Sequence, residues 1–162
     1  MHRTLIIGFG NIDRADDGVA YEVINALRCI QGQEPLKEVE TGLDELGGEM
    51  DSVFLSQLTP ELMDMLVEYD RIIFVDAHVY EDADDLHCAA VLPEYAQSTF
   101  THHMTPAMLL ALLKALYHCE PIGNIVSIRG HDFDFHRGLS PATKALVGKA
   151  AEYIERLISG LA

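Results

Sequence analysis

Three groups of side chains that commonly bind metal ions stand where the sequence predicts loops. Asp16 and Asp17 form an acidic pair within the segment "IIGFGNIDRADDGVA". Asp76 directly follows the apolar run "IIFV", and His102 and His103 precede a leucine-rich stretch. Two carboxylates and a neutral imidazole supply two oxygen ligands and one nitrogen ligand, which suits a borderline divalent ion such as nickel, zinc or manganese. Three protein ligands would leave positions on the ion free for water or substrate.

The same residues also have ordinary structural interpretations. An aspartate after a strand often makes a turn or caps a helix, which would explain Asp16, Asp17 or Asp76 without any metal. A histidine ahead of a helix is usually solvated or structural. Residue types and spacing therefore leave two alternatives open, a metal site and a set of turn and cap residues.

The first motif does not match a dinucleotide-binding fingerprint. Gly8 and Gly10 leave a strand as that fingerprint requires, but its third glycine would stand at position 13, which is Asp13. Asp16 and Asp17 would also face a bound pyrophosphate near a helix N-terminus, where like charges repel. The sequence therefore argues against a nucleotide-binding module.

Apolar runs and helical periodicities alternate along the chain. Strands are predicted at 4–9, 52–58, 71–79 and 124–130, and the acidic segment 81–92 ends strand-like. Helices are predicted from about residue 18, over 59–70, from 105 and over 140–158, and a long polar connection covers 31–51. This alternation predicts one domain over 1–162, a three-layer α/β/α sandwich with a mainly parallel twisted sheet. Ligands of such sheets gather beyond the carboxyl ends of the strands, where the three groups above would meet.

Three of the predicted helices begin with a hydroxyl side chain followed by proline. Thr59, Thr105 and Ser140 are the expected caps, each with proline at the first helical position. The helix from 105 is expected to bury one apolar stripe. That stripe consists of Met108, Leu109, Leu112, Leu113 and Leu116.

Composition limits the classes of partner. The formal charge of −15, from 26 acidic and 11 basic residues, argues against nucleic acid and suits metal ions or basic peptides, although it can also simply maintain solubility. No apolar run approaches the roughly 20 residues of a membrane span, and no signal peptide is evident, so we expect a cytoplasmic protein without membrane association. The three cysteines form no C-x-x-C pair and are expected to be small buried hydrophobes.

Three segments of the chain resemble, in order, the motif regions of the hydrogenase maturation proteases. These segments are "IIGFGNIDRADDGVA", "IIFVDA" and "STFTHHMTPAMLLALL", and the closing stretch "VSIRGHDFDFHRGLSP" also looks like the late strand and last-helix entry of that family. The resemblance covers nearly the whole chain. The motif G-x-G-N followed by an acidic pair and glycine, here with Gly8, Gly10 and Asn11, is fairly specific when joined to the other two.

The resemblance implies a nickel-dependent endopeptidase that trims the C-terminal extension of a [NiFe] hydrogenase large-subunit precursor. It places the metal ligands at Asp17, Asp76 and His102, with Asp16 as a neighbour that caps the helix or holds a ligand, and His103 as the alternative histidine. Nickel would arrive with the precursor, and zinc or cadmium are expected to occupy the site in vitro. Asp17 or Asp76 could instead act as the general base.

The chain departs from the family pattern at two places. Ala20 replaces a common glycine, and "SQLTPELM" replaces a glycine-rich turn that could contact the substrate. Two other functions use the same three ligands: a non-catalytic chaperone for nickel and the precursor, and a small-molecule metallohydrolase. The other histidines are expected to be structural or at the surface, with His78 the closest alternative ligand. The acidic loop 81–87 could attract a basic tail, or could simply be solvated.

Overall fold

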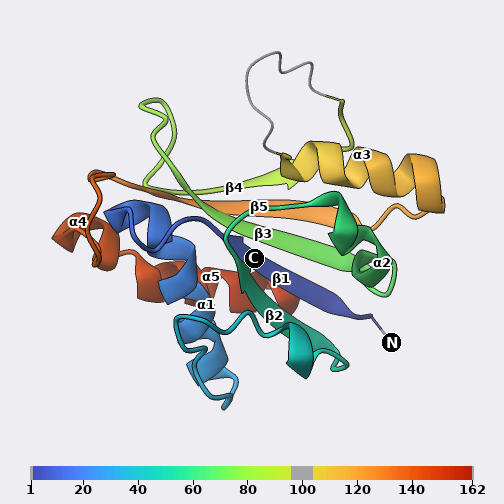
Figure 1. Ribbon diagram of the computed structural model, residues 1–162, viewed down its shortest axis with the longest axis horizontal. Helices are drawn as coiled ribbons and strands as arrows, with labels where there is room; N and C mark the ends of the chain where they lie inside the picture. Colours follow the sequence, from blue (N-terminus) through green and yellow to red (C-terminus); the bar gives the residue numbers. More distant parts are fainter. Residues whose placement is uncertain (1, 96–103, 162) are drawn as a thin grey trace.

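A five-stranded sheet forms the middle of the structure (Figure 1), and the computed structural model describes residues 2–95 and 104–161. The strand order is β2-β1-β3-β5-β4, with β4 antiparallel to β5 and the other neighbours parallel. In chain order the elements are β1 (Thr4–Phe9), η1 (Ala15–Gly18), α1 (Val19–Ile30), η2 (Leu43–Glu45), β2 (Met50–Leu55), η3 (Pro60–Leu62), α2 (Met63–Leu66), β3 (Arg71–His78), β4 (Leu86–Val91), α3 (Pro106–Tyr117), β5 (Ile122–Arg129), α4 (Pro141–Lys144) and α5 (Val147–Ile158).

Helices cover both faces of the sheet, which confirms the three-layer α/β/α arrangement (Figure 1). α1 and α5 pack on one face against strand residues such as Ile73 and Val75. α2 and α3 pack on the other face against Ile72 and Phe74. Because side chains alternate along a strand, Asp76 lies on the same face as Ile72 and Phe74, the face that α3 covers.

The sheet register brings the ends of β1 and β3 together. These strands are parallel neighbours, with Gly8 opposite Val75, so the loop after Phe9 begins beside Asp76. On its other side Asp76 pairs with Ser127 of β5. The carboxyl ends of the central strands therefore meet at one edge, as the sequence predicts.

Helix α1 lies unusually close to β1. A Cβ atom added to Gly8 would come 2.7 Å from Cγ1 of Ile24 and 3.3 Å from Cβ of Ala20, and Ala20 is fully buried. The expectation that Ala20 still permits close packing is confirmed.

Some element boundaries differ from the sequence predictions. β2 spans Met50–Leu55 rather than 52–58, because the chain leaves the sheet after Leu55 and buries Leu58 against the α2 face instead. The predicted helix over 59–70 is only a 3-10 turn followed by one α-helical turn, and the Thr59 hydroxyl accepts no hydrogen bond from the backbone of this helix start. The predicted helix over 140–158 is divided into α4 and α5.

Helix α3 begins where the sequence predicts, but the face that it buries differs from the predicted apolar stripe. Thr105 caps it by accepting a hydrogen bond from the Met108 N–H. The leucines it buries are Leu109, Leu110 and Leu113, whereas Leu116, expected in the buried stripe, is 63% exposed. The prediction for Leu116 is therefore wrong, because the face against the sheet includes position 110. Across residues 2–95 and 104–161 we find no helix with the length and apolar character of a membrane span.

Candidate functional site

The loop after β1 fixes the carboxylate of Asp17. Its Oδ2 accepts a hydrogen bond of 2.8 Å from the Asn11 backbone N–H, and the Asn11 side chain accepts one of 2.9 Å from the Asp13 N–H. Gly10 has φ of +149°, and a Cβ there would lie 2.1 Å from the Asp17 carbonyl oxygen. Only glycine lets the backbone pass so close, so the first motif serves to hold Asp17 at the strand end.

Asp76 lies half-buried near the end of β3, and its carboxyl group has a strongly raised pKa. Burial raises the pKa of Asp76 to about 7, a hydrogen bond of 2.8 Å from the Ala77 N–H opposes this rise, and the negative charge of Asp17 adds to it. The two carboxylates are thus close enough to repel each other. A divalent cation between them would relieve both the repulsion and the burial penalty.

The described residues supply two of the three expected ligands. The structure brings Asp17 and Asp76 together at the sheet edge, whereas His102 and His103 lie outside the described residues. Within residues 2–95 and 104–161, no group of three His, Cys, Asp or Glu side chains is arranged to hold a metal ion. The carboxylate pair fits a divalent ion only if further ligands come from elsewhere, such as a histidine of the 96–103 segment or the substrate.

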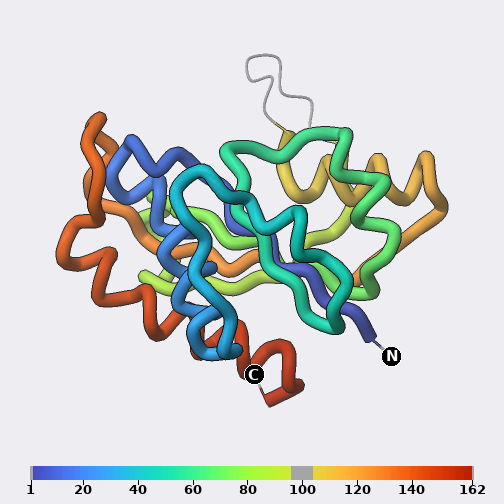
Figure 2. Tube along the Cα trace, turned by 60° about the horizontal axis from the view of Figure 1, so that its bottom comes forward, coloured from blue at the N-terminus to red at the C-terminus, as the bar shows by residue number. Residues whose placement is uncertain are grey.

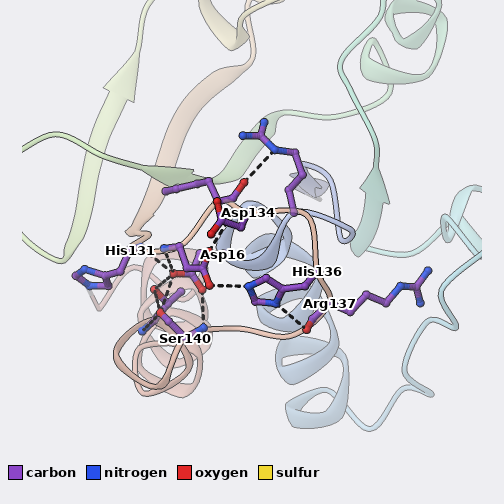
Figure 3. Close-up of polar contacts among 10 residues, drawn as sticks. Asp16, His131, Asp134, His136, Arg137 and Ser140 are labelled. Atoms are coloured by element: carbon purple, nitrogen blue, oxygen red, sulfur yellow. Dashed lines mark hydrogen bonds and ion pairs between the residues drawn. The ribbon is translucent and has the colours of Figure 1, made fainter.

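Asp16 lies in a hydrogen-bond network with the segment after β5 (Figure 3). Its side chain is fully buried. Its carboxylate accepts bonds from the backbone N–H groups of His131, Asp132 and Ser140 and from the hydroxyls of Ser140 and Thr143, at 2.7 to 3.0 Å. Burial alone would raise the pKa of Asp16, but the hydrogen bonds from His131 and Ser140 prevail and lower it to about 2. This carboxylate is already saturated with donors, so its geometry fits a structural tie rather than a ligand.

The segment 130–140 after β5 contacts the site loop, although the sequence analysis placed no site residue in it. It lies beside the first-motif loop in both overall views (Figure 2). The Ala15 N–H donates to the His136 carbonyl at 2.7 Å, and Arg137 Nε donates to Asp13 at 2.9 Å. The sequence showed Ser140 only as a helix cap, which it also is. Its second contact is with Asp16, 124 positions earlier in the chain, and no local sequence pattern predicts such a contact.

His78 follows Asp76 by two residues but is committed to the backbone. Its ring is 5% exposed, and burial lowers its pKa. Nδ1 accepts a hydrogen bond from the Tyr80 N–H at 3.2 Å, which leaves Nε2 to donate to the Asp84 carbonyl at 3.0 Å. With both nitrogens occupied, His78 fixes the loop between β3 and β4 and is not placed to bind a metal ion.

The fold of this chain is similar to that of solved hydrogenase maturation endopeptidases. No family model matches the chain, and no curated protein matches it. Among solved structures, the hydrogenase maturating endopeptidase HybD from E. coli superposes with a TM-score of 0.70 at 20% identity, over 98% of this chain and 94% of that one. The [NiFe] hydrogenase maturation protease HycI from Thermococcus kodakarensis gives 0.66 at 17% identity, over 97% and 92%. The hydrogenase 2 maturation peptidase from a Thaumarchaeota archaeon gives 0.62 at 18% identity, over 99% of both chains.

Proposed function

We propose that this chain, which has the fold of the hydrogenase maturation endopeptidases, is a nickel-dependent endopeptidase. Its substrate would be the precursor of a [NiFe] hydrogenase large subunit, from which it removes the C-terminal extension after nickel insertion. The observation that carries the proposal is the pair of carboxylates at the carboxyl ends of β1 and β3: the charge of Asp17, which lies in η1 after β1, adds to the burial that disfavours the ionised form of Asp76 in β3. The names of the structural neighbours support the substrate class.

In this proposal Asp17, Asp76 and His102 complete the coordination of nickel that arrives in the precursor. The metal would polarise the scissile carbonyl or lower the pKa of a water molecule, which can contribute several kcal/mol of transition-state stabilisation. Because nickel comes with the substrate, a precursor without it would not be held at the carboxylates. Cleavage would then report that the metal has been loaded.

The residues of the chain would orient and hold the reacting groups. Asn11 fixes the Asp17 carboxylate through its backbone N–H, and Asp16 ties the same loop to the segment after β5. Hydrolysis adds the hydroxyl of water to the carbonyl carbon, breaks the C–N bond and gives a proton to the leaving amine. Asp17 or Asp76 could accept the proton of the water as a general base instead of acting only as a ligand.

The test is mass spectrometry of the nickel-loaded precursor incubated with wild-type protein, with Asp17→Asn and with Asp76→Asn, and in parallel without nickel. We expect loss of one defined C-terminal peptide with wild type and nickel only. A complex between the Asn variant and the nickel-loaded precursor, isolated by gel filtration, would separate the two roles, since a lost ligand weakens the complex whereas a lost base leaves it intact.

An uncleaved precursor that still forms a nickel-dependent complex with wild type would contradict the protease and favour a chaperone. No complex with the precursor at all would favour a small-molecule substrate. Cleavage that resists metal chelators and stops with a serine-directed reagent would refute the metal chemistry.

A further inference from the structure

The two outer strands of the sheet, β2 and β4, differ in whether another segment of the chain covers their outer edge. On the β2 side, the connection between α1 and β2 runs along the edge (Figure 1), and the Phe54 N–H donates to the Thr41 carbonyl at 2.9 Å. Gly42 lies so close that a Cβ there would come 2.8 Å from the Ser52 carbonyl oxygen. This edge is therefore covered by the protein itself.

On the β4 side, no strand pairs with the outer edge among residues 2–95 and 104–161. In the antiparallel pair with β5, the Arg129 N–H donates to the Asp85 carbonyl, so every second residue from Asp85 onward faces β5. The backbone N–H and C=O groups of Leu86, Cys88 and Ala90 consequently point away from the sheet. None of these groups has a hydrogen-bond partner among residues 2–95 and 104–161.

The sequence of β4 lacks the usual protection of an edge strand. Such strands normally carry a charged side chain, a proline or a bulge that prevents another strand from pairing. β4 reads "LHCAAV", without proline and without a permanently charged residue, and it pairs with β5 in unbroken register over Leu86–Val91. Its backbone is ready to accept a further strand.

The acidic loop between β3 and β4, residues 79–85, lies at one end of this edge (Figure 1). A hollow of about 580 Å³ opens there, lined by Tyr80, Glu81, Asp82, Ala83, Asp84 and His87. The Tyr80 ring is 67% exposed and offers a face for a cation beside the carboxylates.

Several hydrogen bonds also fix this acidic loop. The Arg129 side chain donates to the Asp85 carboxylate at 2.7 Å, to the Tyr80 carbonyl at 2.8 Å and to the Ala83 carbonyl, and His78 donates to the Asp84 carbonyl. The backbone of the loop around the hollow is therefore fixed, and the carboxylates of Glu81, Asp82 and Asp84 have no ion-pair partner among residues 2–95 and 104–161.

We propose that the open edge of β4 binds an extended segment of the substrate protein as an added strand, with a lysine or arginine of that segment in the acidic hollow. This binding mode rests on the proposed function, because the segment that would occupy the edge is the C-terminal region of the hydrogenase precursor. Charge complementarity favours this occupant over a second copy of the chain, since two copies of net charge −15 repel each other.

The edge lies within reach of the carboxylates. Asp76, Ser127 and His87 occupy one row across β3, β5 and β4, so the β4 end with the hollow is level with Asp76. An added strand would stand three strand spacings from β3, about 14 Å, which an extended chain covers in about four or five residues. A tail anchored on β4 can thus present a nearby peptide bond to Asp17 and Asp76.

The test uses fluorescently labelled peptides from the C-terminal region of the precursor and anisotropy to measure Kd. Ala90→Pro removes an outward N–H while keeping the hydrogen bonds to β5, and Ala90→Val is its matched control with the N–H retained. We expect the Kd to rise at least 10-fold with proline and to change less than twofold with valine, with melting temperatures recorded for both. Asp82→Asn should weaken binding and reduce its salt dependence.

A second arm changes only the peptide and so is independent of protein folding. Backbone N-methylation at alternate residues should abolish binding in one of the two possible registers and leave it intact in the other, because only every second N–H of an added strand faces β4. Equal binding by both peptides, or binding of the unmethylated peptide to a folded Ala90→Pro variant as tightly as to wild type, would overturn the inference.

The outcomes separate this inference from the proposed function. Normal cleavage of the precursor by Ala90→Pro would support protease activity and contradict substrate binding along β4. Alternating sensitivity to N-methylation without any cleavage would support binding along β4 and contradict protease activity. A wild-type dimer in sedimentation that Ala90→Pro dissociates would assign the edge to a second copy and so overturn the inference.

Discussion

The buried carboxylate of Asp76 lowers the stability of the metal-free protein at neutral pH. Its pKa is raised to about 7, so the folded state holds this proton more tightly than the unfolded state does. The stability that it contributes is present below about pH 4 and is lost as the pH rises towards about 7. Asp76→Asn removes this titration, and we expect the metal-free variant to exceed wild type by about 1–3 kcal/mol at about pH 8, with a smaller gain at about pH 5. Urea unfolding in the presence of a chelator measures both values.

The same pair of proteins tests metal binding without an assay of activity. Added Ni²⁺ or Zn²⁺ should raise the Tm of wild type and leave that of Asp76→Asn unchanged, because an ion that binds only the folded state stabilises it. Equal shifts in both proteins would place the bound ion elsewhere.

Asp16 is expected to behave in the opposite way. Its pKa is lowered to about 2 by bonds that form only in the folded state, so its contribution is present above about pH 4 and is lost as the pH falls towards 2. Asp16→Asn places an amide N–H₂ group against several N–H donors, and should cost about 2 kcal/mol at neutral pH, with the deficit shrinking in acid. The exposed Asp13→Asn, which loses only a surface pair with Arg137, should show little change. A deficit of Asp16→Asn that is constant with pH would contradict the charged network.

For Asp16, Asp17 and Asp76, the sequence indicated which residues belong to the site region but not which contacts each of them makes. Asp17 and Asp76 were identified from their places after strands, and the loop with Gly10 and Asn11 holds Asp17 where its charge acts on Asp76. The different fates of Asp16 and Asp17 could not be read from adjacent identical residues. They are decided by Ser140 and Thr143, more than 120 positions away, whose hydroxyls reach Asp16 alone.

Among the elements, the turn from β1 to η1 is the least tolerant of change. Gly10→Ala would force a methyl group to within 2.1 Å of the Asp17 carbonyl oxygen at a φ of +149° that alanine rarely adopts. We expect a loss of at least about 2 kcal/mol in unfolding free energy and displacement of Asp17. Gly148→Ala in α5 meets no atom within 4 Å and should instead stabilise by about 0.5–1 kcal/mol. Denaturant unfolding of both variants decides this, and a harmless Gly10→Ala would refute the close approach.

The elements themselves were largely predictable, and their ends were not. Continuous apolar runs, as in "TLIIGF" and "RIIFVDAH", predicted the buried parallel strands, because both faces of these strands lie under helices. β2 ends early since the neighbouring β1 also ends, at Phe9, opposite Leu55. β4 runs antiparallel to β5 at the outside of the sheet, with β5 between it and β3, and periodicity cannot supply this position or direction.

For the whole molecule, the net charge of −15 should make stability and substrate binding respond to salt in opposite directions. Self-repulsion among 26 acidic groups opposes folding, and salt screens it over about 10 Å at 0.1 M. Between low and about 0.5 M NaCl we therefore expect the unfolding free energy to rise by on the order of 1 kcal/mol, or about 3 °C in Tm. The same screening removes the attraction between the hollow beside β4 and a basic tail, so the Kd of the precursor peptide should rise over that range even as the protein becomes more stable. Thermal unfolding and anisotropy on one salt series test both trends, and a Kd that stays constant while Tm rises would show that the acidic surface serves solubility alone.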